Sequence, residues 1–185
     1  MQLDDAIQKR QSIRSYSSKK VDFALITEIL EAGRQAPAAG NISTIKFVVV
    51  EKPELREKLA EAAGQQFISQ APWIIVVCSA TEQTTRSYEE RAEMYSRQQA
   101  GAAIENMLLK ITALGLASCW IGAFDDDAVK AILHIPDNVD VEALLPVAYP
   151  ASIPLKRKRQ ELKLMTYFEQ YGQTQKRPAF KPEAK

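Results

Sequence analysis

Apolar and polar positions along the chain follow two periods, one helical and one extended. Apolar residues at helical spacing predict helices over 3–10, 24–33, 54–64 and 99–114, and a short helix that opens at Asp125 or Asp126. Short apolar or β-branched runs bounded by turn residues predict strands over 47–50, 73–78, 118–121 and 143–148. Because helices alternate with strands, the pattern predicts a layered sandwich with helices against both faces of one sheet.

Two stretches depart from this pattern. Residues 81–98 are polar and charged, and we expect a surface excursion that contains some helix. From Tyr149 onward the chain becomes rich in Pro, Lys and Arg, with scattered aromatic residues. We predict one domain, in which 1–150 forms the body and 151–185 is a C-terminal extension. The aromatic residues of the extension need a surface to cover them, and a partner subunit would supply one.

Composition limits the classes of function. The 185 residues are 46% hydrophobic, which is enough for one sizeable core. The 24 basic and 23 acidic residues leave a net charge of +1, so there is no bulk attraction to nucleic acid or to an anionic membrane. The longest apolar run, Trp73–Cys78, is too short to span a bilayer. Since the N-terminus carries no hydrophobic signal segment, we expect a cytoplasmic protein.

Histidine and cysteine are scarce. A single histidine, His134, argues against a histidine-rich or cysteine–histidine metal site, and we predict no metal. Any Ser-His-Asp triad would have to use His134, at the end of an element near a turn. Cys78 and Cys119 both lie in apolar contexts. They could pair, but the pattern favours free buried thiols in a reducing compartment.

Two constellations in the first quarter of the chain carry candidate chemistry. Arg10, Ser12 and Arg14 place two guanidinium groups and a hydroxyl within a few residues, where a helix gives way to extended chain. This is either a solvated basic turn or a grip on a phosphate, since arginine binds phosphate as a planar fork. The loop 37–41 is built from small residues and Asn41, which would let a planar ligand approach the backbone. It could equally be an ordinary connection between a helix and a strand.

Two further constellations lie later in the chain. Gly122–Ala123 follow a predicted buried strand and would expose backbone N–H groups that can bond a ring nitrogen; an ordinary turn is the alternative. The run Lys156–Arg159 suggests a nuclear-localisation or nucleic-acid segment, but the rest of the chain has no basic surplus. In extended chain Arg157 and Arg159 would point to the same side and could converge on one phosphate or ring oxygen.

The order of these motifs resembles the FMN-dependent nitroreductase family over roughly residues 3–165. The resemblance rests on a set of short segments in a family-like order: 10–14, 36–41, Ala71-Pro72 before an apolar strand, 106–109, 114–122, 145–150 and 157–159. It implies an α+β fold, a three-layer α/β/α sandwich around a mixed central sheet, with 1–150 as the FMN-binding domain. It also implies a homodimer that binds FMN at the subunit interface, with the C-terminal arm embracing the partner subunit.

The resemblance assigns roles to residues of this sequence. Arg10, Gln11, Ser12 and Arg14 would bind the phosphate and ribityl chain, joined by Arg159, and Arg157 would lie near the pyrimidine end of the flavin. The partner subunit would contribute its own loop, and the end of the third predicted strand would line the ring near its reactive nitrogen. These last two sets of cofactor contacts are Pro37, Ala38, Ala39 and Asn41 for the loop, and Gly122 and Ala123 for the strand end.

The implied activity is transfer of electrons from NADH or NADPH, through FMN, to a small flat acceptor such as a nitroaromatic or quinone, by a ping-pong mechanism. We name no catalytic side chain, and Tyr88, Met94 and Tyr95 are candidates for residues over the substrate slot. Residues 42–45 lack the Gln-Pro-Trp that often follows the asparagine in the family, and Gly122–Ala123 replace a common Glu-Gly pair. Two alternatives stay open: a flavin-binding relative that fragments flavin or removes halogen, and an interaction protein that uses the basic C-terminal run.

Overall fold

The computed structural model describes residues 1–174 of the chain. The chain divides into two compact units, Met1–Pro154 and Leu155–Lys185. The first unit contains every strand and α-helix that the described residues form. Within that described part, no helix is both long and apolar enough to cross a membrane.

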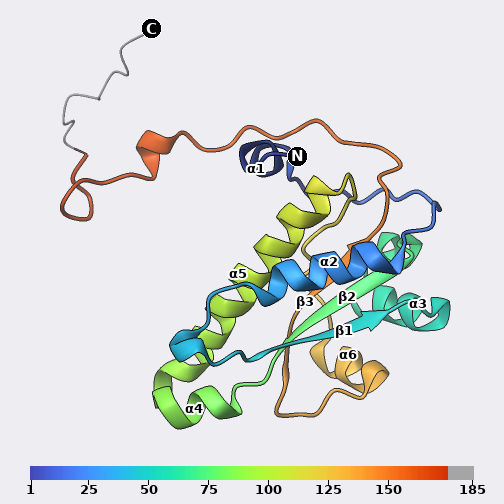
Figure 1. Ribbon diagram of the computed structural model, residues 1–185, viewed down its shortest axis with the longest axis horizontal. Helices are drawn as coiled ribbons and strands as arrows, with labels where there is room; N and C mark the ends of the chain where they lie inside the picture. Colours follow the sequence, from blue (N-terminus) through green and yellow to red (C-terminus); the bar gives the residue numbers. More distant parts are fainter. Residues whose placement is uncertain (175–185) are drawn as a thin grey trace, which may run out of the picture. The chain divides into compact units, whose positions relative to one another are not determined.

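The sheet has three strands in the order β1-β2-β3. These are β1 (Ile45–Val50), β2 (Trp73–Ser79) and β3 (Asp140–Val147), and both neighbouring pairs are antiparallel. The expected mixed sheet is therefore wrong for the described residues. No described strand runs parallel to a neighbour, because each strand returns beside the preceding one in the opposite direction (Figure 1).

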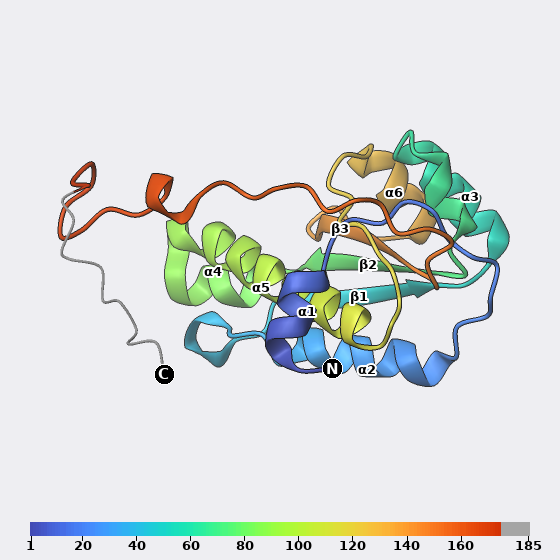
Figure 2. The same ribbon diagram turned by 90° about the horizontal axis from the view of Figure 1, so that it is seen from above.

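Helices lie against both faces of this sheet, as the edge-on view in Figure 2 shows. On one face lie α2 (Phe23–Arg34) and α5 (Ala92–Ala113). On the other lie α3 (Pro53–Ala62) and α6 (Asp126–Leu133). The remaining helices of the first unit are α1 (Leu3–Lys9), α4 (Glu82–Tyr88), and the short 3₁₀ turns Ala39–Asn41, Gln66–Gln70 and Glu89–Arg91.

The central strand β2 explains why both faces are covered. Every residue of β2 is buried, as its unbroken apolar run predicts. Because successive side chains point to opposite faces, Ile75 and Val77 pack with α2 and α5, while Ile74 and Val76 pack with α3 and α6. The predicted α and β elements are thus confirmed for most of the chain.

The expected strand 118–121 does not form. This segment touches β3 and its continuation only through two isolated bridges, from Ala117 to Ala148 and from Ile121 to Leu144. Between the bridges, Cys119 lies opposite Pro146 of β3, which has no backbone N–H to donate. The ladder is therefore interrupted there, and the Ser118 carbonyl, which points away from β3, accepts from the amide of Ile13.

Helix starts agree with the sequence at two acidic caps and differ at one long helix. Asp22 accepts from the Ala24 amide at 2.9 Å, and Asp125 accepts from the Ala128 amide at 3.0 Å. The long helix α5, expected from Gln99, already begins at Ala92. The first turns of α5 bury only small residues, Ala92 and Ser96, and their other residues are mostly polar or charged. The sequence of these turns is therefore typical of a polar surface segment.

We expect Gly33→Ala to destabilise the fold, because Gly33 lies where α2 contacts α5 and β1. A methyl group there would lie 2.8 Å from the Met107 sulfur and 2.9 Å from the Phe47 ring. Overpacking of this kind costs about 1–3 kcal/mol in the free energy of unfolding, measurable by urea denaturation. Gly101→Ala on α5 is the matched control, since its nearest contact is 3.9 Å and the change should be neutral or stabilising. Equal stability of the two variants would contradict this packing.

The second unit, in its described residues, contains one 3₁₀ turn, Leu162–Leu164, and otherwise irregular chain. Several of its large apolar side chains are exposed: Leu155, Leu162, Leu164, Met165 and Tyr171. The rings of Tyr167 and Tyr171 pack on each other at 4.7 Å. Part of the predicted extension 151–185 lies outside the described residues.

Candidate functional site

The segment that follows α1 is fixed to the first unit by backbone hydrogen bonds. The Ile13 amide donates to the Ser118 carbonyl at 2.9 Å, and the Ser17 amide donates to the Tyr149 carbonyl at 2.8 Å. Ile13 is buried, whereas Arg14 is exposed and forms no ion pair within the described residues. The guanidinium of Arg14 is therefore presented to solvent from a fixed backbone and can accept an anion.

The other predicted residues of this segment have partners within the chain or are partly buried. The Arg10 Nε atom lies 3.4 Å from a carboxylate oxygen of Glu105 on α5, and the Arg10 side chain is only 19% exposed. Gln11 donates its side-chain amide to the Pro154 carbonyl at 3.2 Å. Ser12 is partly buried. A phosphate at this segment would meet one unpaired arginine and one arginine shared with an acidic partner.

Gly122 and Ala123 lie at the surface, directly after the bridge between Ile121 and Leu144. Their backbone N–H groups donate no hydrogen bond to any described residue, whereas the Ala123 carbonyl accepts from the Gln65 side chain at 3.4 Å. These N–H groups are exposed and unused within the described residues, while their predicted bond to a ring nitrogen stays a prediction. The hydrogen bond from the Ile13 amide to the Ser118 carbonyl joins the arginine segment to the stretch of chain that leads into this turn.

Two buried hydroxyls near these segments have no hydrogen-bond partner among the described residues. They belong to Tyr16 and Ser118. Burial raises the pKa of Tyr16 far above its ordinary value, and Cys119 adds to the rise while Arg14 opposes it. Tyr16 is therefore neutral and can act only as a hydrogen-bonding group. Sequence analysis missed both hydroxyls, because only the tertiary structure leaves them unpaired.

The loop 37–41 turns sharply at its end, where Gly40 and Asn41 adopt φ angles of 56° and 60°. The predicted contact residues are partly or fully exposed: Pro37, Ala38, Ala39 and Asn41. Behind the loop, Gln99 of α5 accepts hydrogen bonds from the Thr44 amide and hydroxyl, at 3.1 and 2.9 Å. A buried side chain thus fixes the exit of the loop to α5.

The loop and the arginine segment do not meet within one chain. The loop lies beside α4 and the beginning of α5, whereas α1 lies beside the later part of α5 (Figure 1). The contacts agree, since Gly40 lies against Tyr88 before α5 begins, while Arg10 pairs with Glu105 within the helix. Within the first unit, the predicted loop residues and the predicted arginine segment are therefore separate from each other in a single chain.

We expect Gly40→Ala to distort this loop. A methyl group at Gly40 would collide with the Tyr88 hydroxyl, and the left-handed backbone is strained for any residue with a Cβ. The expected cost is about 2 kcal/mol in unfolding free energy, falling to about 1 kcal/mol in a Tyr88→Phe background that lacks the hydroxyl. Urea denaturation of the four members of this double-mutant cycle checks it. Purely additive costs would exclude the Tyr88 contact.

Tyr88 also contacts the start of α5. Its ring meets the Tyr95 ring edge-on, with centroids 5.2 Å apart. The next residue, Glu89, has a φ of 44°, so the chain makes a strained turn between α4 and α5. Met94 is 41% exposed on α5. Tyr88 thus lies against the predicted loop, while a role of Tyr88, Met94 and Tyr95 over a substrate slot stays a prediction.

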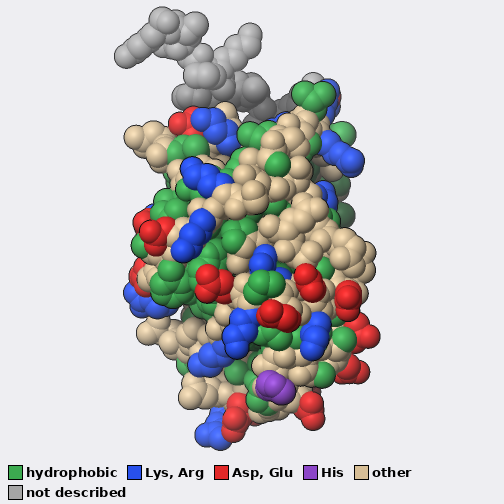
Figure 3. Space-filling view, turned by 90° about the vertical axis from the view of Figure 1, so that its right-hand side faces the viewer, with side chains coloured by type: hydrophobic (Ala, Val, Ile, Leu, Met, Phe, Trp, Pro, Cys, Tyr) green, Lys and Arg blue, Asp and Glu red, His purple; other side chains and the backbone are tan. Residues whose placement is uncertain are grey.

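Arg157 and Arg159 are exposed and belong to the second unit. Their predicted contacts with the cofactor stay predictions. On the face shown in Figure 3, Lys and Arg side chains are interspersed with Asp and Glu side chains. That face therefore offers no continuous basic surface of the kind that binds nucleic acid.

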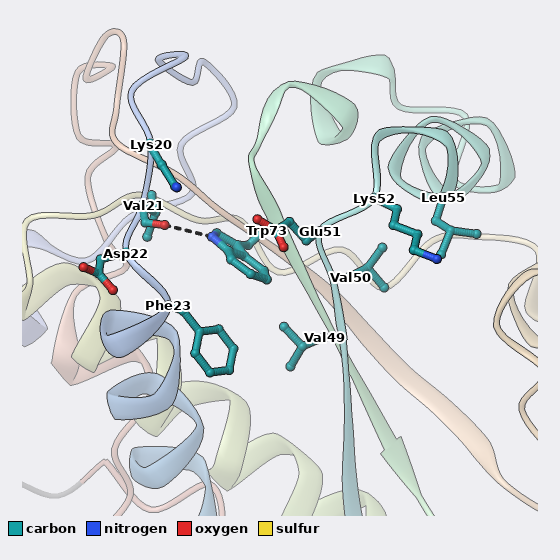
Figure 4. Close-up of a pocket in the computed structure, with 10 residues that line it drawn as sticks. All are labelled: Lys20, Val21, Asp22, Phe23, Val49, Val50, Glu51, Lys52, Leu55 and Trp73. Atoms are coloured by element: carbon teal, nitrogen blue, oxygen red, sulfur yellow. Dashed lines mark hydrogen bonds between the residues drawn. The ribbon is translucent and has the colours of Figure 1, made fainter.

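A pocket of about 850 Å³ lies elsewhere, between the start of α2, the end of β1 and the start of β2 (Figure 4). Its lining includes Phe23, Trp73 and two lysines, Lys20 and Lys52, and the Trp73 indole donates to the Val21 carbonyl at 3.0 Å. None of the predicted cofactor residues lines it. This pocket is therefore not the predicted cofactor site.

Cysteine and metal chemistry add no further site. Cys78 and Cys119 are buried and unpaired, which confirms the prediction of free thiols. Burial beside Glu142 raises the pKa of Cys78 to about 11, so this thiol stays protonated at neutral pH. In the part of the chain that the structure describes, no cluster of His, Cys, Asp and Glu could hold a metal ion.

Comparison with known proteins places the chain in a family. A sequence model of the Nitroreductase family matches residues 7–69 and 62–149. A relative from Archaeoglobus fulgidus, named for NADH dehydrogenase and NAD(P)H nitroreductase, is 34% identical over 149 residues, covering 78% of this chain and 83% of the relative. An FMN reductase (NADPH) from Bacillus subtilis is 25% identical, with 84% and 68% covered. An iodotyrosine deiodinase from Thermotoga neapolitana is 22% identical, with 86% and 95% covered.

Solved structures show the same fold. A nitroreductase family protein from Clostridium novyi is 27% identical and superposes with a TM-score of 0.76, over 94% of this chain and 96% of that one. NfrA2 from B. megaterium is 24% identical and superposes with a TM-score of 0.85, over 92% and 76% of the two chains. With the family model matched over most of the chain, this protein belongs to the Nitroreductase family.

Proposed function

We propose that this chain is an FMN-dependent oxidoreductase that moves electrons from NADH or NADPH to a small flat acceptor, such as a nitroaromatic or quinone. The observation that carries the proposal is the fixed segment Arg10–Arg14, which is hydrogen-bonded through Ile13 to Ser118 on the stretch of chain that leads into the turn Gly122–Ala123. The segment presents permanent positive charge, and the turn presents backbone donors that no described residue uses. The names of relatives for NAD(P)H nitroreductase and FMN reductase support the same activity.

The residues present fit FMN. Arg14, Arg10 and Ser12 would bind the phosphate and ribityl chain, because guanidinium forks and hydroxyls are suitable donors for phosphate oxygens. The guanidinium of Arg14 and the backbone N–H groups of Gly122 and Ala123, unpaired within the described residues, are exposed donors of the kind that an anionic ligand with a polar ring edge requires. When bound, FMN supplies the redox chemistry by accepting electrons from the nicotinamide and passing them to the acceptor.

The protein's own residues would bind FMN and orient its ring. The N–H groups of Gly122 and Ala123 would hydrogen-bond the ring, and Arg157 and Arg159 would add positive charge from the C-terminal arm. No acidic or imidazole side chain occurs in either fixed segment, so we assign no catalytic residue. We propose that nicotinamide and acceptor occupy one slot in turn, which gives ping-pong kinetics.

We further propose a homodimer with FMN at the subunit interface. The loop 37–41 would reach the arginine segment of the partner subunit, since it does not reach its own. Leu3 and Ile7 of α1 are 65% and 52% exposed, beside a groove of about 430 Å³ between α1, α2 and α5. Such apolar exposure is typical of a covered interface. The exposed apolar residues of the arm would embrace the partner, and the free buried thiols fit a cytoplasmic protein.

The test is steady-state oxidation of NADH and NADPH by the FMN-loaded protein, with a quinone and a nitroaromatic as acceptors. We expect oxidation that depends on acceptor and on FMN, with parallel double-reciprocal plots. Protein that holds FMN but shows no acceptor-dependent oxidation would reject the reductase function.

Dehalogenation is the second candidate, because the Thermotoga neapolitana relative is named an iodotyrosine deiodinase. The same protein would then reduce a halogenated tyrosine and release halide. Halide release measured with iodotyrosine, under conditions where quinone reduction is also measured, separates the two activities.

A further inference from the structure

Trp120 is an exposed aromatic side chain held on a rigid stretch of backbone. Its indole is 41% exposed, while the flanking Cys119 and Ile121 are almost fully buried. Ile121 both donates to and accepts from the backbone of Leu144, at 3.1 and 3.0 Å. Buried neighbours on both sides therefore point the indole outward and fix its position.

Two glycines leave the surface around this indole uncovered. A methyl group at Gly101 of α5 would lie 3.9 Å from the far edge of the Trp120 ring, and one at Gly122 would lie 3.8 Å from its indole nitrogen. Both are ordinary contact distances, so packing within the chain does not require glycine at either position. Glycine inside a helix costs about 1 kcal/mol relative to alanine, so packing within the chain gives no reason for glycine at position 101.

The indole lies beside the arginine segment. Gly101 and Glu105 are four residues apart on α5 and share one face of the helix. A methyl group at Gly101 would lie 3.9 Å from the Trp120 ring, and Glu105 pairs with Arg10, so the indole and the guanidinium lie along the same face of α5, about one helical turn apart. The Ile13–Ser118 hydrogen bond ties the same segments together a few residues away.

We propose that Trp120 is the aromatic wall of the flavin site, an inference that rests on the FMN-binding function proposed above. The indole lies near Gly122 and on the same face of α5 as the Glu105–Arg10 pair, so one ligand with a phosphate at one end and a flat ring at the other, as FMN has, would meet both the arginines and the indole. Stacking on an aromatic side chain holds such a ring in place. Trp120 is thus a positioning residue that contacts the cofactor ring.

The test compares the wild type with Trp120→Phe, Trp120→Ala and the control Trp73→Phe, which changes the other tryptophan, buried beside Phe23. FMN affinity is measured by ultrafiltration, and the emission of bound flavin is measured at saturating protein. An indole in contact quenches flavin emission by brief electron transfer to the excited ring, and phenylalanine does not. We expect emission several-fold brighter in Trp120→Phe, unchanged emission in Trp73→Phe, and FMN affinity about tenfold weaker in Trp120→Ala.

The outcomes separate this inference from the proposed function. If every variant binds FMN and Trp120→Phe emits like the wild type, Trp120 does not contact the ring, although FMN binding stands. If the wild type itself fails to bind FMN, both proposals fall. Phenylalanine retains an aromatic ring at a half-exposed position, so this variant remains informative even where Trp120→Ala is unstable.

Discussion

Replacing both Arg10 and Arg14 with alanine is expected to weaken FMN binding about 10³-fold, because each charge-assisted hydrogen bond contributes about 1.5–3 kcal/mol. Arg14→Ala alone should cost more than Arg10→Ala, since Arg14 has no ion pair in the described chain and Arg10 shares its charge with Glu105. The measurement is equilibrium binding of FMN by ultrafiltration or fluorescence titration.

The matched control is Arg34→Ala. Arg34 is also a surface arginine with an acidic partner, Glu31, but it lies on α2 and belongs to neither predicted cofactor segment. Its loss should leave FMN affinity unchanged. Affinity that falls equally in Arg34→Ala and in the double variant would mean that general charge, and not the segment 10–14, attracts the phosphate.

Replacing Arg56 with alanine is expected to lower the unfolding free energy by about 3 kcal/mol, because several carbonyls lose a charged donor. From α3 its guanidinium donates to the Glu51 carbonyl at 3.0 Å, to the Ser69 carbonyl at 2.9 Å and to the Ala71 carbonyl. These bonds join the end of β1 to the chain that enters β2. For a protein of this size the melting temperature should fall by roughly 6–12 °C.

Lysine at position 56 should recover only part of this loss, because a single ammonium group lacks the fork that spans separate carbonyls. Arg86→Ala is the control: this exposed arginine pairs with Glu82 on the same helix, and its loss should cost no more than about 0.5 kcal/mol. Urea denaturation of the three variants measures the differences. A cost for Arg56→Ala as small as that of Arg86→Ala would show that solvent replaces the guanidinium.

Local sequence patterns correctly predicted the elements that are determined by residues close together in the sequence. The apolar run of β2, the Asp22 and Asp125 caps and the loop at 37–41 all appear where the sequence places them. The failures depend on residues that are distant in the sequence or small. Residues 118–121 read as a strand, but Cys119 lies opposite Pro146 of β3, which has no N–H to donate. The start of α5 reads as polar surface, because its buried residues, Ala92 and Ser96, are small.

The residues of the candidate site also divide into those that the sequence suggests and those that only the structure brings to attention. Arg10, Arg14, Gly122 and the loop could be named from the sequence because their residue types suit phosphate and ring binding and their order resembles the family; their contacts with the cofactor stay predictions. Trp120 was missed, because an aromatic residue beside a buried strand is usually core, and only the structure shows it exposed between two glycines. The separation of the loop from the arginines could not be predicted from composition or spacing, since it depends on the direction in which α5 runs.

The most direct test of the account is the visible absorption spectrum of the purified protein after incubation with FMN and removal of unbound flavin by gel filtration. A flavin spectrum at stoichiometric intensity, carried by a species of dimeric size, is the predicted result. Protein that elutes without flavin absorbance would contradict the central claim that the arginine segment and the Gly122–Ala123 turn form an FMN site.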